Sequence, residues 1–382
     1  MGIIGNGSTG VQVITAIAKD VKQLVCFQRT PQYSVPSGDG PVSKEYREDI
    51  NRRYDEIWKQ VKNSVVAFGF EESKVPAMSV SPEERERVFE AAWQKGNGFR
   101  FMFWTFCDLT YNEEANEEAC KFIRQKIAQI VKDPEKARKL TPHDFYARRP
   151  LCDAGYYEQF NRDNVEIVDL KETPIIAITS KGIKTSSGID GAGSKEYELD
   201  VIIFATGFDA VDGNYTRLDI LGRNGESLNE HWDHEGGPTT YLGICVPGFP
   251  NLFMITGPNG PFTNIPPTIE TQVEFISDAI AKAEADNTVK KEEAPTHGEG
   301  DQAQNDHHGP LIEATKDAED AWTDLCRQLS DNSLFKKTDS WIFGANIPGK
   351  KHAVMFFFGG LAAYREKLRE SVEAGYRGFK PF

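Results

Sequence analysis

The sequence predicts an α/β fold with a Rossmann-type dinucleotide-binding domain, on two observations near its start. A short apolar run at Gly2–Ile4 leads into the pattern G-x-G-x-x-G at Gly5–Gly10, and residues 11–18 have the composition of a helix. A second apolar run, Gln23–Phe27, has the character of a buried strand. In this setting the glycines allow a tight turn, close approach of a pyrophosphate and close helix packing. The helix N-terminus offers N–H groups to the phosphates. The alternative is a glycine-rich turn in another α/β sheet.

The residues after the second strand select the nucleotide. Domains that bind NADH usually place an acidic side chain there, for the ribose 2′-hydroxyl. This chain has Gln28, Arg29 and Thr30 instead. The planar guanidinium of Arg29 suits a 2′-phosphate, so the sequence favours NADPH over NADH. The alternative is a solvated surface arginine.

Length, charge and cysteine content restrict the functional class. The chain has 382 residues, which is enough for two or three domains, and a net charge of −14, which argues against nucleic acid and anionic membranes as partners. No apolar run approaches the length of a membrane span. The six cysteines form no C-x-x-C pair and the seven histidines show no metal spacing, so we expect free thiols, a cytoplasmic location and no metal site.

After Thr30 the chain leaves the sheet for a helical region, from about residue 43 to about residue 140. Its aromatic stripe at 99–106 is more typical of a core than of a pocket wall. Apolar runs at 165–168, 175–178 and 199–204 predict that strands resume, with a glycine-rich hairpin loop at 186–194.

Two further strands are predicted to end in loops that could hold a ligand. The strand at 199–204 leads into Ala205, Thr206 and Gly207, and a strand at 252–256 leads into a glycine–proline loop at 257–261, with a helix from about Thr268. Ligands of open α/β sheets bind beyond such carboxyl ends, although ordinary turns between strand and helix are the alternative.

The last part of the chain has four expected features. Residues 286–310 are polar and acidic, which predicts a disordered insertion. Residues 314–329 predict a helix, residues 340–351 a loop with an aromatic anchor, and residues 354–358 a final strand.

Taken together, these stretches make the chain resemble a type I Baeyer–Villiger monooxygenase. The resemblance runs from Gly2 nearly to Phe382. It is carried by the long stretches 5–36, 146–165, 204–215, 257–270 and 340–360.

The resemblance implies a flavoprotein of three parts. The NADPH-binding domain is expected at 1–29 and 156–207, with a helical subdomain at 30–155. Residues 208–382 are expected to form the C-terminal part of an FAD-binding domain.

The chemistry that the resemblance implies is the oxidation of a ketone to an ester or lactone by FAD, NADPH and O2, through a peroxyflavin. An arginine beside the flavin stabilises the developing negative charge, and it matches Arg149 in the stretch Ala147–Asp153. Arg148 matches the position that holds the 2′-phosphate of NADPH, together with Arg29. An Arg-Arg pair is by itself more often a surface feature.

The resemblance also implies the remaining contacts. The expected cofactor-binding residues are Gly5, Gly7, Ser8, Thr9, Gly10, Gln12, Arg29, Thr30, Arg148, Ala205, Thr206, Gly207, Asn259, Trp341 and Lys350. Trp341 and Lys350 are expected on a mobile loop that closes over the nicotinamide. The expected substrate pocket consists of Phe262, Thr263, Ile265, Phe356 and Phe358. For these side chains an ordinary core role is the alternative.

The sequence lacks two motifs that are expected in this family. The glycine loop that holds the FAD pyrophosphate is not found, nor is the motif F-x-G-x-x-x-H-x-x-x-W-P. A Rossmann strand at the initiator methionine is unusual, so we expect the sequence to be part of a longer protein. Two other functions stay open: a non-catalytic NADPH-binding remnant, and a flavin monooxygenase that oxidises nitrogen or sulfur centres.

Overall fold

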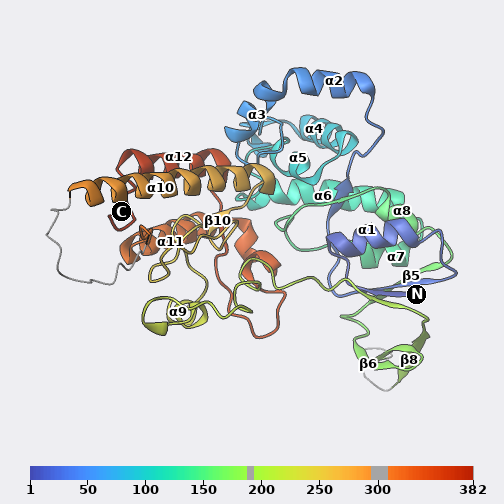
Figure 1. Cartoon of the computed structure of the whole chain (residues 1–382). Helices are drawn as coiled ribbons and strands as arrows, with labels where there is room; N and C mark the ends of the chain where they lie inside the picture. The colour runs from blue at the N-terminus through green and yellow to red at the C-terminus, as the bar shows by residue number, and fades with distance from the viewer. Residues whose placement is uncertain (187–192, 294–308, 382) are drawn as a thin grey trace. The chain divides into compact units, whose positions relative to one another are not determined.

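The computed structural model describes residues 1–186, 193–293 and 309–381 and divides into two compact units, which we describe separately (Figure 1). Unit 1 comprises Met1–Arg52 and Phe70–Phe208, and unit 2 comprises Arg53–Gly69 and Asp209–Phe382. Residues 53–69, which fall within the predicted helical subdomain, group with unit 2. The three-part division expected from the sequence remains a prediction.

Unit 1 is built on a parallel four-stranded sheet. Its strands lie in the order β5-β2-β1-β9 and all pairs are parallel. The bounds are β1 Gly2–Ile4, β2 Leu24–Gln28, β5 Val165–Asp169 and β9 Ile202–Phe204. Helix α1 (Ser8–Ile17) connects β1 to β2. This order is that of one half of a Rossmann fold, with the topological switch point between β1 and β9. The predicted α/β fold class is confirmed.

The remaining elements of unit 1 are mostly helices around an aromatic core. Phe99, Phe101, Met102 and Phe106 are all buried, and the ring of Phe89 packs 5.4 Å from that of Phe101. The predicted core role of the aromatic stripe is therefore confirmed. These elements are β3 Ser34–Pro36, α2 Lys44–Arg52, a 3-10 turn Ala77–Ser79, α4 Pro82–Lys95, α5 Gly98–Phe103, α6 Glu113–Ile130, α7 Pro134–Leu140, β4 Leu151–Asp153 and α8 Tyr156–Gln159.

A small antiparallel sheet completes unit 1. Its strands are β6 (Ile175–Thr179), β7 (Gly182–Ser186) and β8 (Ser194–Glu198), in that order. Strands β7 and β8 pair as the arms of the predicted hairpin, of which residues 187–192 lie outside the described residues. The expected strand at 199–204 forms only from Ile202, because β8 uses the residues up to Glu198 and the chain turns before β9.

Unit 2 is mainly helical. Its helices α10 and α12 run alongside each other (Figure 1), and its core contains Trp322, Phe357 and Tyr364. A short parallel pair joins β10 to β11. The elements are α3 Tyr54–Lys62, a 3-10 turn Arg223–Gly225, α9 Leu228–His234, β10 Gly260–Pro261, α10 Ile265–Glu293, α11 Lys316–Asp331, 3-10 turns Leu334–Lys337 and Trp341–Phe343, β11 Phe356–Phe357 and α12 Gly360–Glu373.

Two expectations for unit 2 are wrong. The run 252–256 forms no strand, because its backbone is bonded elsewhere: the Met254 N–H donates to the Ile244 carbonyl and the Thr256 N–H to the Gln272 side chain. The predicted disordered insertion does not begin at residue 286, since α10 continues to Glu293 through residues that are mostly good helix formers. Residues 294–308 lie outside the described residues.

Candidate functional site

The glycine loop between β1 and α1 closes tightly at two of its glycines and stays open at the remaining one. Gly5 has φ of +103°, and a Cβ atom there would lie 2.3 Å from the Ala205 carbonyl oxygen. A Cβ atom at Gly10 would lie 2.2 Å from the Gly5 carbonyl oxygen. At Gly7, in contrast, no atom lies within 4 Å of an added Cβ. The first and third glycines therefore let the loop close on itself, while the second keeps a face open.

No side chain of the first turn compensates the partial positive charge at the N-terminal end of α1. Gly7 is the N-cap residue, no side chain caps the helix, and the first turn has no acidic residue. Backbone N–H groups at such a helix start attract anions. Ser8 is half-buried, while Thr9 and Gln12 are exposed. These residues leave the start of α1 accessible to solvent.

The Ala-Thr-Gly loop after β9 lies against the glycine loop. The Ala205 N–H donates to the Ile4 carbonyl at 2.8 Å, and Gly5 approaches the Ala205 backbone. Gly207 has φ of +91°, so the chain turns sharply at a conformation that glycine accepts easily. Ala205 to Gly207 and Gly5 to Gly10 thus meet at the carboxyl ends of two adjacent strands. This is the edge where open α/β sheets bind their ligands.

Two buried polar side chains fix the glycine loop to the end of β2. The Asn6 Nδ2 donates to Gln28 Oε1 at 2.8 Å and to the Thr30 carbonyl at 3.1 Å. The Gln28 Nε2 in turn donates to the Lys139 carbonyl at 2.6 Å. Both side chains are at least nine-tenths buried. Arg29 follows directly, is exposed and has no ion-pair or hydrogen-bond partner among the described residues.

The structure brings Arg149 to the start of α1. Its Nη1 donates to Ser8 Oγ at 3.2 Å, across 141 residues of sequence. The neighbouring Arg148 forms an ion pair with Asp144 at 2.5 Å. The predicted pair of arginines therefore diverges: one guanidinium reaches the glycine loop, and the other is held by a carboxylate.

Anchors on both sides hold the segment that carries Arg149. On one side Tyr146 is buried, and the buried Asn116 side chain bonds to both its backbone N–H and its carbonyl at 3.0 Å. On the other side β4 pairs with β3, and Ser34 Oγ donates to Asp153 Oδ2 at 2.5 Å. Arg149 thus stands between fixed points, which reduces the conformational entropy lost when it binds an anion.

In unit 2 the expected pocket residues form an aromatic cluster. The Phe262 ring lies 5.3 Å from that of Phe356 and 5.6 Å from that of Phe358. Trp341 packs edge-on against Phe356 at 5.8 Å. Phe335 joins at 5.4 Å from Phe262, which sequence reasoning missed. These rings pack together beside the β10–β11 pair.

The other expected residues of this loop differ in exposure. Asn259 is buried: its Nδ2 donates to the Val354 carbonyl at 2.7 Å, while its Oδ1 has no hydrogen-bond partner among the described residues. Thr263 is half-buried and lies 3.4 Å from Thr268 through their hydroxyls. Ile265 is 58% exposed and begins α10. An unpaired buried oxygen is rare and suits a polar group of a ligand.

Lys350 is held by two carboxylates. Its ammonium donates to Asp212 Oδ1 at 2.5 Å and to the Asp209 carboxylate. Burial disfavours the charged lysine, but the two carboxylates outweigh it and hold the pKa of Lys350 above its ordinary value. Asp209 and Asp212 were not predicted. A doubly acidic segment directly after the Ala-Thr-Gly loop was the only sequence signal for them.

Comparisons with known proteins find relatives over nearly the whole chain. No protein-family model matches the chain, and no helix among the described residues is long and apolar enough to cross a membrane. The chain is 54% identical over 376 residues to a Baeyer–Villiger monooxygenase of Pseudooceanicola batsensis, covering 98% of this chain and 64% of that protein. It is 48% identical over 379 residues to a phenazine N-monooxygenase of Lysobacter antibioticus, covering 99% and 65%.

A solved structure gives the same picture. The crystal structure of cyclohexanone monooxygenase from Rhodococcus sp. Phi1 bound to NADP+ superposes with a TM-score of 0.89 at 55% identity, covering 99% of this chain and 66% of that one. The chain thus spans about two thirds of the length of the proteins that it matches. Across that length, the fold agrees. The chain belongs to the Baeyer–Villiger monooxygenase family.

Proposed function

We propose that the chain forms the NADPH-binding part of an FAD-dependent Baeyer–Villiger monooxygenase, which converts ketones to esters or lactones with O2. The observation that carries this proposal is the contact between Arg149 and Ser8, 3.2 Å from Nη1 to Oγ. It supports a permanent cation beside the phosphate-binding turn, where negative charge must be stabilised. The six free cysteines support a reducing compartment, the cytoplasm.

The residues of unit 1 fit NADPH. The open face at Gly7 leaves room for a pyrophosphate, and the uncapped start of α1 offers N–H groups to it. We assign Ser8 and Thr9 to the phosphates, and the unpaired Arg29 to the 2′-phosphate. Arg148 would reach that phosphate only by releasing Asp144.

In unit 2 the unpaired Oδ1 of Asn259 and the aromatic cluster around Phe262 are suited to the flavin and an apolar ketone. When bound, NADPH supplies a hydride and FAD supplies the means of activating O2. The role we assign to this chain's own residues is to orient, to exclude water and to stabilise charge. The Arg149 guanidinium stabilises the negative oxygen that develops as the ketone carbonyl is attacked. Within unit 2, the rings at Phe262, Phe356 and Phe358 would keep water from an apolar ketone bound beside them.

Arg29 provides a test of nucleotide choice. We expect Arg29→Ala to weaken NADPH binding by about tenfold, because a charge-assisted contact to the 2′-phosphate contributes about 1.5 kcal/mol. NADH carries no such phosphate, so its affinity should not change. Titration calorimetry with both nucleotides measures the effect. Arg162→Ala, at another exposed arginine of unit 1, is the matched control. An equal loss for NADPH and NADH would contradict the assignment.

A second function is favoured by one of the relatives. The phenazine N-monooxygenase is 48% identical to this chain, so oxidation at an aromatic nitrogen is an alternative to ketone oxidation. Incubating the purified FAD-loaded protein with NADPH, and with either cyclohexanone or phenazine, separates the two functions. A lactone supports the first and an N-oxide the second. A protein that binds NADPH but stays colourless with added FAD would leave a non-catalytic NADPH-binding role.

A further inference from the structure

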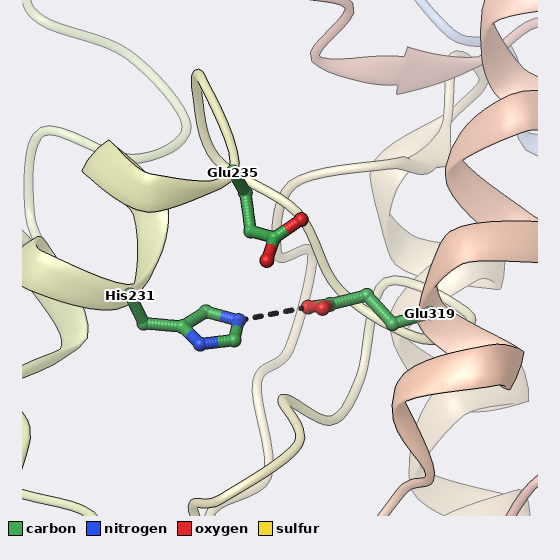
Figure 2. A group of neighbouring side chains, drawn as sticks. All are labelled: His231, Glu235 and Glu319. Atoms are coloured by element: carbon green, nitrogen blue, oxygen red, sulfur yellow. Dashed lines mark hydrogen bonds and ion pairs between the residues drawn. The ribbon is translucent and has the colours of Figure 1, made fainter.

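A cluster of three potential metal ligands lies in unit 2 and includes none of the residues assigned to substrate and cofactors. His231 is in α9, Glu235 directly follows that helix, and Glu319 is in α11. One ligand atom from each lies within 4.8 Å of the others. Figure 2 shows the three side chains pointing toward one another from the two segments. The imidazole Nε2 of His231 lies 3.3 Å from Glu319 Oε1.

Glu319 is fully buried, yet its carboxylate is only half satisfied. Its Oε1 accepts a hydrogen bond from Thr239 Oγ1 at 3.0 Å and faces the His231 ring. Its Oε2 is buried and has no hydrogen-bond partner among the described residues. The Lys316 ammonium lies 3.5 Å from Oε2. A buried carboxylate oxygen in this state is costly, and it is a strong acceptor for a cation.

The surrounding charges leave the cluster short of positive charge. The single ammonium of Lys316 is shared between Glu235 at 2.9 Å, Glu319 and Asp320. The negative charges of three carboxylates are thus faced by one ammonium and one imidazole. This excess of negative charge favours the binding of an added cation.

We propose that His231, Glu235 and Glu319 bind one divalent transition-metal ion of the Zn2+ type. An imidazole nitrogen and two carboxylates form a ligand set that such ions accept, with water as the fourth ligand. Tetrahedral ligands of Zn2+ lie roughly 3.4 Å apart, so the side chains must close by about an ångström. Glu235 is only half-buried and can make this movement. The Lys316 ammonium then moves to Asp320, which it already contacts.

The ion would join the end of α9 to α11. Since these segments are distant in sequence, binding should stabilise the folded state alone and raise its Tm. The spacing of His231 and Glu235 resembles common helix-borne ligand pairs, but Glu319 lies far away along the chain. This explains why the sequence alone gave no metal site.

The test uses the tag-free full chain in which His297, His307 and His308, all outside the described residues, are replaced by Gln. Co2+ serves as the probe, because its visible spectrum reports tetrahedral coordination, and Zn2+ competition gives the affinity. We expect one Co2+ per chain. We expect at least tenfold weaker binding in His231→Gln and in Glu319→Gln, and tighter binding in Lys316→Met, which removes the competing ammonium.

His234→Gln is the matched control, because His234 is exposed and pairs with Glu226 rather than with the cluster. It should bind Co2+ as the parent does. Equal binding in His231→Gln and His234→Gln would overturn the proposal, as would no Co2+ binding by the parent and by Lys316→Met. If circular dichroism shows that the Gln variants do not fold, Lys316→Met decides: tighter binding supports the site, and unchanged or weaker binding overturns it.

Discussion

Arg149→Ala is expected to lower the rate of ketone oxygenation by about 10²–10³-fold, the usual cost of losing one donor that stabilises a developing oxyanion. The guanidinium is permanently charged, and anchored segments on both sides hold it beside Ser8. An alanine cannot replace either the charge or the paired donors. The rate of lactone formation in the FAD-loaded protein measures the effect, with NADPH affinity determined alongside.

Two comparisons make the result specific to ketone oxidation. Arg148→Ala removes a guanidinium that Asp144 already holds, so it should leave the rate of lactone formation nearly unchanged. Oxidation of a sulfide develops no alkoxide on the substrate, so Arg149→Ala should largely retain it. If Arg149→Ala left both lactone formation and sulfide oxidation unchanged, the role we assign to Arg149 would be wrong.

Lys350→Met should destabilise unit 2 by about 3 kcal/mol, because it leaves two carboxylates without their shared counter-ion. The Lys350 side chain is 14% exposed and that of Asp212 only 6%, so solvent cannot replace the ammonium. Chemical denaturation followed by tryptophan fluorescence measures the change. Lys351→Met is the matched control, since Lys351 is exposed and adjacent.

A rescue variant separates charge from packing in this prediction. Adding Asp209→Asn and Asp212→Asn to Lys350→Met removes the uncompensated charges, and should recover most of the lost stability. If Lys350→Met were as stable as Lys351→Met, the ion pairs would contribute nothing to the folded state.

The sequence predicted the part of the site that depends on local pattern. The glycine loop, α1 and the Ala-Thr-Gly turn are each encoded within a few residues, whereas the strand order β5-β2-β1-β9 came from the structure. A family resemblance added Arg149. The contact between Arg149 and Ser8 could not be derived from spacing, because it joins residues 141 positions apart.

The sequence did not predict most of the hydrogen bonds between polar side chains that are distant along the chain. Asn6 and Gln28 are ordinary polar residues in the sequence, and only the fold makes them a buried pair. The strand expected at 252–256 failed for a related reason. An apolar run forms a strand only where its backbone can hydrogen-bond to a neighbouring strand. Here the backbone N–H groups donate instead to the Ile244 carbonyl and to the Gln272 side chain.

The central claim is that a nucleotide pyrophosphate binds at the open face of the glycine loop, and Gly7→Val tests it most directly. Gly7 has φ of −72° and ψ of −167°, which valine accepts, and an added Cβ there meets no protein atom. The change should lower the Tm by no more than about 4 °C, the cost of a poorer N-cap. The Kd for NADPH should nevertheless rise by at least about tenfold, because the side chain fills the space of the phosphate. An unchanged Kd would contradict the account.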